Sequence, residues 1–260
     1  MRKSLNILSI LKVMRNSIRS TFYFLGLKRY ETTETYKEII PPEIKIGEFY
    51  NLIGLIASQS DVVTILEIGS SSGEGSTKAI FDSLAPIPYA KKQIHCMEIS
   101  RERHEKLSSY LKSDPRFHSH RMSSVLIADF PSFEDVKHFH SFYKTNLSKI
   151  HIDTVESWYK KDIQYLVDNP DLVPSESISG INWIRQKFKI EFFDFVIIDG
   201  GEFTGFAEYE CLRGARYIAL DDTNTYKNWY ARKMLLEDQN YKLVDENLTE
   251  RNGWAVFAHV

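Results

Sequence analysis

Residues 65–77 read ILEIGSSSGEGST, and this stretch decides the fold. A short apolar strand that contains Glu67 runs into a Gly-x-x-x-Gly-x-Gly loop, and helix-forming sequence follows the loop. Glycine lets the backbone turn sharply and approach a ligand closely. The N-terminus of the following helix offers free N–H groups and the positive end of the helix dipole. The stretch therefore predicts a strand–loop–helix unit that binds a carboxylate or phosphate group.

Outward from this unit, strands and helices alternate along the chain. Apolar runs rich in β-branched and aromatic residues predict strands at 62–68, 93–99, 117–122, 192–198 and 217–220, with a terminal antiparallel strand or hairpin from 241–244 and 254–258. Helices are predicted at 44–57, 75–84, 101–111, 207–213 and 228–238. This alternation is typical of an α/β fold in which a mostly parallel sheet carries helices on both faces.

Residues 123–191 interrupt the alternation. They contain aromatic residues and histidines in polar surroundings, the turn sequence Asn169-Pro170 and a helical pattern at 147–166. We interpret this segment as an insertion between the third and fourth strands that forms a cap over the site.

The spacing of the glycines and a second acid indicate a cofactor class. Gly69 and Gly73 are four residues apart, and Glu98 ends the next predicted strand. This combination resembles motif I and its partner acid in the class I S-adenosylmethionine-dependent methyltransferases, a family with a Rossmann-like fold. Two alternatives stay open: a dinucleotide site, which prefers Gly-x-Gly-x-x-Gly, and a structural loop without a ligand.

The resemblance implies a role for each matching residue. The loop would wrap the methionine part of S-adenosylmethionine, Glu67 would orient the loop or the cofactor's amino group, and Glu98 would bind the ribose hydroxyls. Ser124 follows the third strand, where the family contacts adenine. The cofactor-binding residues implied in this way are Glu67, Gly69, Ser70, Gly73, Gly75, Ser76, Glu98, Ser124 and Asp199.

Three carboxylates end the fourth and fifth predicted strands. Asp199 follows the most apolar strand of the chain, and Asp221 and Asp222 follow the next. The carboxyl ends of parallel strands open into one crevice, so these side chains should meet there. Because carboxylates repel one another unless a cation lies between them, and hard oxygen ligands suit Mg²⁺ or Mn²⁺, we predict a metal site at Asp199, Asp221 and Asp222. The alternative is that Asp221 caps the strand and Asp222 opens a turn.

The same acids resemble those of metal-dependent O-methyltransferases of the macrocin O-methyltransferase type. Asp199-Gly200 and Asp221-Asp222 match that pattern, whereas Gly201-Glu202 stands where that family has Asp-His. The resemblance implies methylation of a hydroxyl on a sugar or small polar metabolite with divalent-metal assistance. Catalytic candidates are Asp199, Lys227 and Glu202, with His151 and His259 as further candidates for the base. N-methylation of a small amine and a non-catalytic cofactor-binding protein are the alternatives.

Charge divides the chain unevenly. Residues 1–30 hold seven Lys/Arg and no Asp or Glu, which leaves residues 31–260 with 26 basic and 35 acidic residues. Such an acidic body excludes general nucleic-acid binding, because that binding depends on neutralising phosphates. We therefore expect a small-molecule or glycan substrate and no nucleic acid. With only two cysteines, a reduced cytoplasmic protein is expected.

The basic end has the period of an amphipathic helix. Its apolar stripe comprises Ile7, Leu11, Met14, Ile18, Phe22 and Leu25, and Lys12, Arg15 and Arg19 run beside it. Such a helix can lie on an anionic membrane surface, or it can pack on the domain or on a second subunit of a homo-oligomer. We accordingly predict an N-terminal extension at 1–40 and a methyltransferase-like domain at 41–260, capped at about 123–191.

Overall fold

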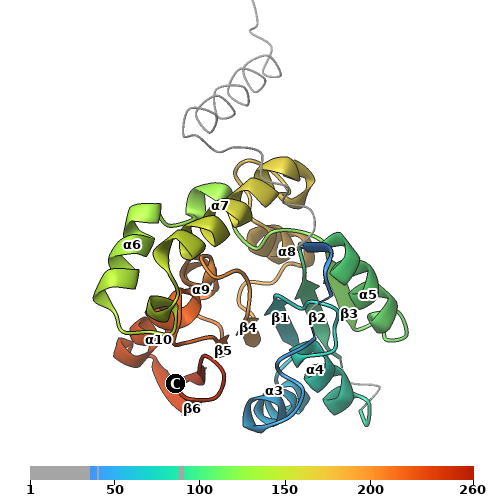
Figure 1. The fold of residues 1–260 in the computed structure, drawn as a ribbon. Coiled ribbons are helices and arrows are strands. Elements are labelled where there is room, and N and C mark those ends of the chain that lie inside the picture. Colours follow the sequence, from blue (N-terminus) through green and yellow to red (C-terminus); the bar gives the residue numbers. More distant parts are fainter. Residues whose placement is uncertain (1–35, 40, 88–90) are drawn as a thin grey trace, which may run out of the picture.

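The computed structural model describes residues 36–39, 41–87 and 91–260, so the helix predicted within residues 1–30 lies outside the described residues. A seven-stranded sheet in the order β3-β2-β1-β4-β5-β7-β6 forms the centre of the molecule (Figure 1). Its strands are β1 (Thr64–Ile68), β2 (Gln93–Met97), β3 (Phe117–His120), β4 (Phe195–Ile198), β5 (Tyr217–Asp221), β6 (Tyr241–Asn247) and β7 (Trp254–His259). The strands β1 to β5 are parallel, and β7 runs antiparallel to both β5 and β6.

Helices cover both faces of this sheet because successive strand residues point to opposite sides. On one face, Ile65 and Ile197 pack in a core with α3 (Glu48–Ser58), α4 (Ser76–Leu84) and α5 (Arg101–Leu111). On the other, Leu66 and Val196 pack with α8 (Gly180–Phe188), α9 (Gly205–Leu212) and α10 (Tyr226–Glu237). The predicted α/β fold, with a mostly parallel sheet, two helical layers and a terminal antiparallel pair, is confirmed.

Several element boundaries differ from the prediction, and the start of one helix matters for the site. The strand β4 begins at Phe195 instead of 192, because Asp194 turns its Oδ2 onto the backbone N–H groups of Val63 and Thr64, at 2.8 and 2.7 Å. The helix α10 begins at Tyr226 instead of 228, where the hydroxyl of Thr225 caps it. The earlier start places Lys227 in the first turn of α10.

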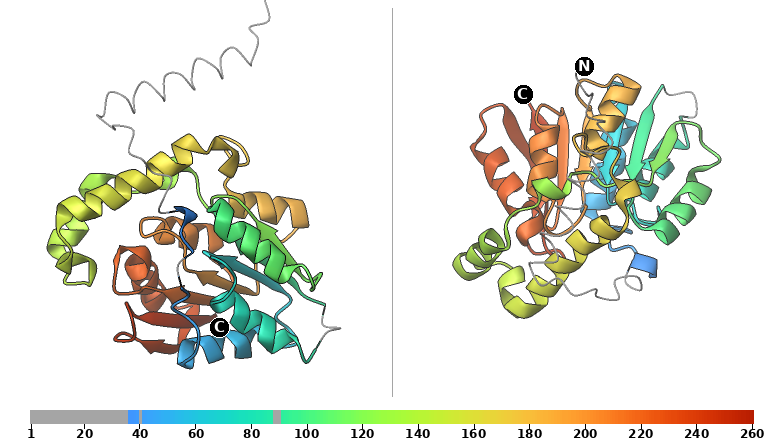
Figure 2. Two further views of the ribbon diagram at one scale, coloured as in Figure 1. Left: turned by 45° about the vertical axis from the view of Figure 1, so that its right-hand side comes forward. Right: turned by 90° about the horizontal axis from the view of Figure 1, so that it is seen from above.

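The segment predicted as a cap contains two kinds of helix. α6 (Phe133–Phe142) and α7 (Ile152–Asp168) share a small core of their own, in which Phe139 and Val155 meet Phe203 and Tyr226. α8 instead belongs to the layer on the sheet. The views in Figures 1 and 2 show α7 extending across the edge of the sheet where the parallel strands end. The division of the chain into domains stays a prediction.

In the part of the chain that the structure describes, three short 3₁₀ helices join these elements: η1 (Ile127–Asp129), η2 (Leu147–Lys149) and η3 (Pro170–Leu172). Over the described ranges 36–39, 41–87 and 91–260, no helix combines the length and the apolar character that a membrane crossing requires.

Candidate functional site

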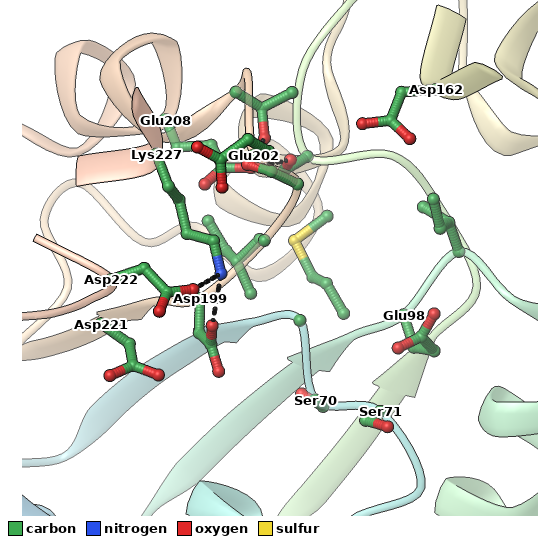
Figure 3. A pocket seen from close by; sticks show the side chains of 18 of the residues that line it. Ser70, Ser71, Glu98, Asp162, Asp199, Glu202, Glu208, Asp221, Asp222 and Lys227 are labelled. Carbon is green, nitrogen blue, oxygen red and sulfur yellow. Dashed lines mark hydrogen bonds and ion pairs between the residues drawn. The ribbon is translucent and has the colours of Figure 1, made fainter. Parts of the chain in front are cut away.

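A pocket of about 540 Å³ lies at the carboxyl ends of the parallel strands, within the size range of small-molecule sites. The loops after β1, β2, β4 and β5 form its floor, residues 41–44 form one wall, and α7 contributes another. Most residues predicted from the sequence meet here: Gly69, Ser70, Gly75, Ser76, Glu98, Ser124, Asp199, Glu202, Asp221, Asp222 and Lys227. Figure 3 shows this pocket with Glu98 and the serines at one end and the Asp199 cluster at the other.

Glu67 supports the glycine loop from below. Its carboxylate is fully buried and accepts hydrogen bonds from the hydroxyls of Ser70, Ser76 and Thr77, at 2.7, 2.5 and 2.6 Å. The loop and the first turn of α4 are thereby tied to the end of β1. Glu67 does not line the pocket, so it acts on a ligand only through the loop.

The glycines of the loop serve different purposes. Gly69 has φ of +85°, and a Cβ there would lie 1.9 Å from the carbonyl oxygen of Asp199. Only glycine therefore allows the β1 and β4 loops to meet beneath the pocket. Gly73 also has φ of +85°, but a Cβ there would meet Leu107 and Tyr110 of α5 at 3.0 Å. Gly73 thus faces α5 and is not among the residues that line the pocket, although the sequence predicts it as a ligand contact.

Glu98 lies at the pocket end of β2. Its Oε1 accepts the backbone N–H of Ser100 at 2.7 Å, and burial raises the pKa of the carboxyl group. Ser124 also lines the pocket, but its hydroxyl donates to Oε1 of Glu208 at 2.6 Å. Ser124 therefore already has a buried partner within the protein.

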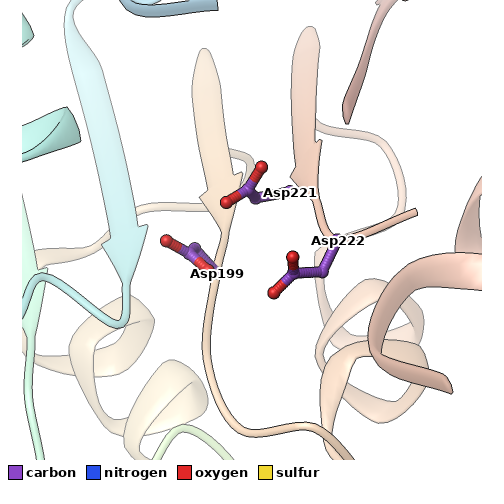
Figure 4. A group of neighbouring side chains, drawn as sticks. All are labelled: Asp199, Asp221 and Asp222. Atoms are coloured by element: carbon purple, nitrogen blue, oxygen red, sulfur yellow. The ribbon is translucent and has the colours of Figure 1, made fainter. Parts of the chain in front are cut away.

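The three aspartates meet as predicted. Each offers a carboxylate oxygen within 4.8 Å of the others, at the ends of β4 and β5 (Figure 4). A lysine joins them: Nζ of Lys227 lies 2.9 Å from Oδ1 of Asp199 and 2.5 Å from Oδ2 of Asp222. The third carboxylate, Asp221, pairs with the guanidinium of Arg251 at 2.7 Å. The protein itself thus brings two cations to the cluster.

These charges shift the pKa values in different directions. Burial, together with repulsion from Asp221 and Asp222, raises the pKa of Asp199 well above its usual range. Burial also raises the pKa of Asp221. Burial favours a raised pKa for Asp222 too, but the Lys227 ammonium outweighs it, and the pKa of Asp222 is lowered. For Lys227, burial is outweighed by Asp199 and Asp222, so its pKa is raised and the ammonium stays charged.

Glu202 lies on the loop after β4, on the cap side of the cluster in Figure 3. The backbone N–H of Tyr226 donates to its Oε1 at 2.9 Å, and the hydroxyl of Thr225 donates to its Oε2 at 3.3 Å. Burial raises the pKa of Glu202 to about 7, although the nearby Lys227 opposes the shift. A carboxylate with this pKa can exchange a proton near neutral pH, as a general base must.

Lys161 and Asp162 of α7 escaped the sequence analysis. They follow Trp158 by three and four residues, so all three lie on one side of the helix, and all three line the pocket. For Trp158, the sequence left open whether it stacks on a ring substrate or packs within the insertion. Burial raises the pKa of Asp162 to about 6, opposed by a hydrogen bond from Tyr36. The helical period marks α7, but it does not tell which side of the helix meets the sheet.

Arg251 was also missed, because it lies in the turn between β6 and β7 and no local motif marks it. Two proposed bases are not in the pocket lining. His151 caps the N-terminus of α7 and is exposed, and His259 ends β7 beside Tyr241, at the opposite edge of the sheet.

Comparison with protein-family models gives no match for this chain, and comparison with curated proteins gives none either. Solved structures with a similar fold include cofactor-bound Rv0187 from MTB, at 13% identity and a TM-score of 0.48, covering 88% of this chain and 87% of that one. An O-methyltransferase from Bacillus cereus in complex with SAH has 11% identity and a TM-score of 0.43, covering 95% and 90%.

A third similar structure is the O-methyltransferase TomG from Streptomyces achromogenes in complex with SAM, at 15% identity and a TM-score of 0.43, covering 94% of this chain and 96% of that one. Several of the similar solved structures are thus O-methyltransferases. The identities and TM-scores are too low for these similarities to bear on the activity of this chain.

Proposed function

We propose that this protein is an S-adenosylmethionine-dependent methyltransferase that methylates a hydroxyl group of a sugar or small polar metabolite. The observation that carries the proposal is one continuous pocket. It joins a glycine loop, a helix N-terminus and the buried acid Glu98 to a reactive end formed by Lys227 and Glu202. The motifs quoted from the sequence therefore converge in a single cavity at the end of the sheet where α/β proteins bind ligands.

The cofactor end has the features that S-adenosylmethionine requires. The backbone at Gly69 has no room for a Cβ, and α4 begins at Ser76 without a side-chain cap, which leaves backbone N–H groups for a carboxylate. Glu98 keeps carboxylate lone pairs beyond its bond to Ser100, which suits a pair of ribose hydroxyls. Bound there, S-adenosylmethionine supplies a methyl group that its sulfonium charge has already activated.

The acceptor has its place between α7 and the aspartate cluster. Trp158 is 39% exposed and lines the pocket, so a sugar or other ring can pack against its indole. Asp162 offers carboxylate oxygens to hydroxyl groups on the same side. Glu202 accepts the proton of the reacting hydroxyl as the oxygen takes the methyl group, while the electrons of the broken carbon–sulfur bond stay on sulfur.

The divalent ion expected from the sequence meets an obstacle in the structure. Its three carboxylate ligands are present, but Lys227 pairs with two of them and Arg251 with the third. The proposed reaction therefore includes no step through a metal ion.

N-methylation of a small amine is a second candidate, favoured by the acidity of the pocket. Lining carboxylates outnumber lining cations, and they include Glu43, Glu98, Asp162, Asp199, Glu202, Glu208, Asp221 and Asp222. Such a wall attracts an ammonium group, and Glu202 would remove the proton that makes the amine a nucleophile.

Two measurements test the proposal. S-adenosylmethionine and S-adenosylhomocysteine should raise the melting temperature by mass action, and NAD should not. Methyl-labelled S-adenosylmethionine incubated with sets of sugars, other polyols and small amines should label one of the oxygen acceptors. Label in the amines alone would favour N-methylation. Stabilisation by NAD and not by S-adenosylhomocysteine would overturn the cofactor assignment.

A further inference from the structure

Lys227 lies where a divalent cation bound by Asp199 and Asp222 would have to lie. Its Nζ is 2.9 Å from one carboxylate and 2.5 Å from the other, and the residue is only 8% exposed (Figure 3). Three carboxylates meet two cations in this cluster, Lys227 and Arg251, so most of the charge that would attract a metal ion is already neutralised. The side chain of Asn252 also donates to Oδ1 of Asp222, at 2.9 Å.

Two contacts fix the position of the main chain at this lysine. The side-chain amide of the next residue, Asn228, donates to the carbonyl oxygens of Ile198 and Asp221, at 2.8 and 2.6 Å. The start of α10 is thereby fixed to the ends of both β4 and β5. On the other side, α9 packs so closely that a Cβ on Gly205 would lie 2.0 Å from the carbonyl oxygen of Lys227. The fold therefore holds the base of the Lys227 side chain directly beside the gap between the two strand ends.

A divalent ion would displace the ammonium from this gap. Lys227 would then be a charged group in a buried place with its partners taken away, which is strongly unfavourable. The donor atoms suit Mg²⁺ or Mn²⁺, but the chain has filled the position between them with a cation of its own.

We infer that the ammonium of Lys227 replaces a divalent cation, so that the aspartate cluster works without metal. The catalytic part of this inference rests on the function proposed above. An ammonium has three N–H donors, and Asp199 and Asp222 use two of them. The third donates to the oxygen of the acceptor, which orients the hydroxyl and makes its proton easier for Glu202 to remove. Lys227 thus does for the acceptor what a bound metal ion does in other sites.

Metal binding tests the inference independently of any activity. Mn²⁺ is titrated into the wild-type protein, the Lys227→Met variant and a Lys233→Met control on the exposed side of the same helix, followed by the electron paramagnetic resonance signal of free Mn²⁺. We expect wild type and control to bind no Mn²⁺ in the submillimolar range. Lys227→Met should bind it at least tenfold more tightly, because Asp199 and Asp222 are released. Tight Mn²⁺ binding by the wild type, lost in Asp222→Asn, would overturn the inference.

A second variant covers the case in which Lys227→Met does not fold. Lys227→Gln loses the ammonium but keeps an amide that can donate to Asp199 or Asp222, so it should fold, and it should also bind Mn²⁺ at least tenfold more tightly than the wild type. If folded Lys227→Gln binds Mn²⁺ no better than the wild type, the ammonium is not what excludes the metal and the inference is wrong.

Once an acceptor is known, turnover adds a second readout. EDTA should leave the wild-type rate unchanged, and Lys227→Met should lose at least tenfold in rate while it still binds S-adenosylhomocysteine. Loss of wild-type turnover in EDTA, restored by Mg²⁺, would overturn the inference. If no acceptor is methylated at all, the proposed function fails, while the Mn²⁺ titration still decides whether Lys227 excludes a metal.

Discussion

The hydroxyl of Tyr36 donates a hydrogen bond of 2.6 Å to Oδ1 of Asp162 and so ties the start of the described chain to α7. The ring of Tyr36 also stacks on Tyr165 of the same helix, with ring centroids 3.9 Å apart. Residues 41–44, a few positions further along, form one wall of the pocket. The N-terminal side of the domain and the inserted helix are thus joined across the pocket, although 126 positions separate the bonded residues.

Removing this hydroxyl should weaken the fold measurably. Tyr36→Phe loses a hydrogen bond to a carboxylate, so the free energy of unfolding in urea should fall by about 1.5–3 kcal/mol. The pKa of Asp162 should rise further, because the bond from Tyr36 lowers it. Tyr209→Phe is the matched control, since the buried hydroxyl of Tyr209 has no hydrogen-bond partner among the described residues. Equal losses in the two variants would contradict the role of the Tyr36 bond.

Truncation of the N-terminus should have two distinct outcomes. Deleting residues 1–30 should preserve the rise in melting temperature caused by S-adenosylhomocysteine, because the pocket wall begins at Tyr36. Deleting residues 1–44 should abolish it. If the basic segment contacts membranes, only the full-length protein should bind anionic vesicles, and salt should release it. A change from dimer to monomer on removing residues 1–30 would assign the segment to a subunit contact instead.

The ribose contact expected of Glu98 can be tested without disturbing the fold. Glu98→Gln keeps the size of the side chain but removes its charge, so affinity for S-adenosylhomocysteine, measured by calorimetry, should fall by roughly 10- to 100-fold. Stability without ligand should stay the same or rise, because burial disfavours the charged form of Glu98. Glu74→Gln, on the same glycine loop but outside the lining, is the control. Unchanged affinity in Glu98→Gln would remove this residue from the cofactor site.

Glu202 should set the pH dependence of turnover. With its pKa raised to about 7, the group is protonated and inactive as a base below that pH, so the rate should rise as the pH increases through about 7. Glu202→Gln should lower kcat by roughly 10²- to 10⁴-fold, abolish this rise and leave S-adenosylhomocysteine binding intact. The exposed Glu210 of α9, changed to Gln, serves as the control. A rise near pH 7 that survives in Glu202→Gln would point to another base.

Two histidines in the sheet should make the protein sensitive to acid. Burial lowers the pKa of His95 to about 3 and that of His120 to about 4, helped by the neighbouring His118 and Lys187. Below about pH 6.5, the ordinary pKa of histidine, the unfolded chain therefore binds more protons than the folded protein. The free energy of unfolding should fall as the pH decreases from there toward about 4. Each histidine should contribute a loss of about 1.4 kcal/mol per pH unit in this window.

The buried acids Asp162 and Glu202 have the opposite effect on stability. Because their pKa values are raised in the folded protein, their protonation at falling pH stabilises the folded state relative to the unfolded chain. The histidine contribution is therefore isolated by comparing variants in urea at several pH values. His120→Gln should show a shallower loss of stability between about pH 6 and 4 than the exposed control His138→Gln. Parallel curves for the two variants would show that His120 is not the cause.

The sequence alone determined the framework of the protein. The apolar runs at 62–68 and 192–198 predicted the buried strands, and the glycines after Ile68 predicted the strand–loop–helix unit. The meeting of Asp199 with Asp221 was also predictable. Parallel neighbouring strands end at the same edge, so residues that follow them directly must lie close together. Information of this kind is local, because it depends on side-chain period and on backbone rules that act over a few residues.

The tertiary structure decided what the predicted residues contact. Gly73 lies in the same loop as Gly69, yet a side chain at Gly73 would point toward α5 instead of the ligand. Asp221 forms an ion pair with Arg251 because the antiparallel pair β6–β7 returns beside β5. Asp162 accepts a hydrogen bond from Tyr36 because α7 crosses the strand ends. Lys227 occupies the position predicted for a metal ion because it lies in the first turn of α10. Asn228 fixes that turn to the ends of β4 and β5. Such contacts depend on strand order, helix rotation and the joining of distant segments, which a local sequence pattern does not encode.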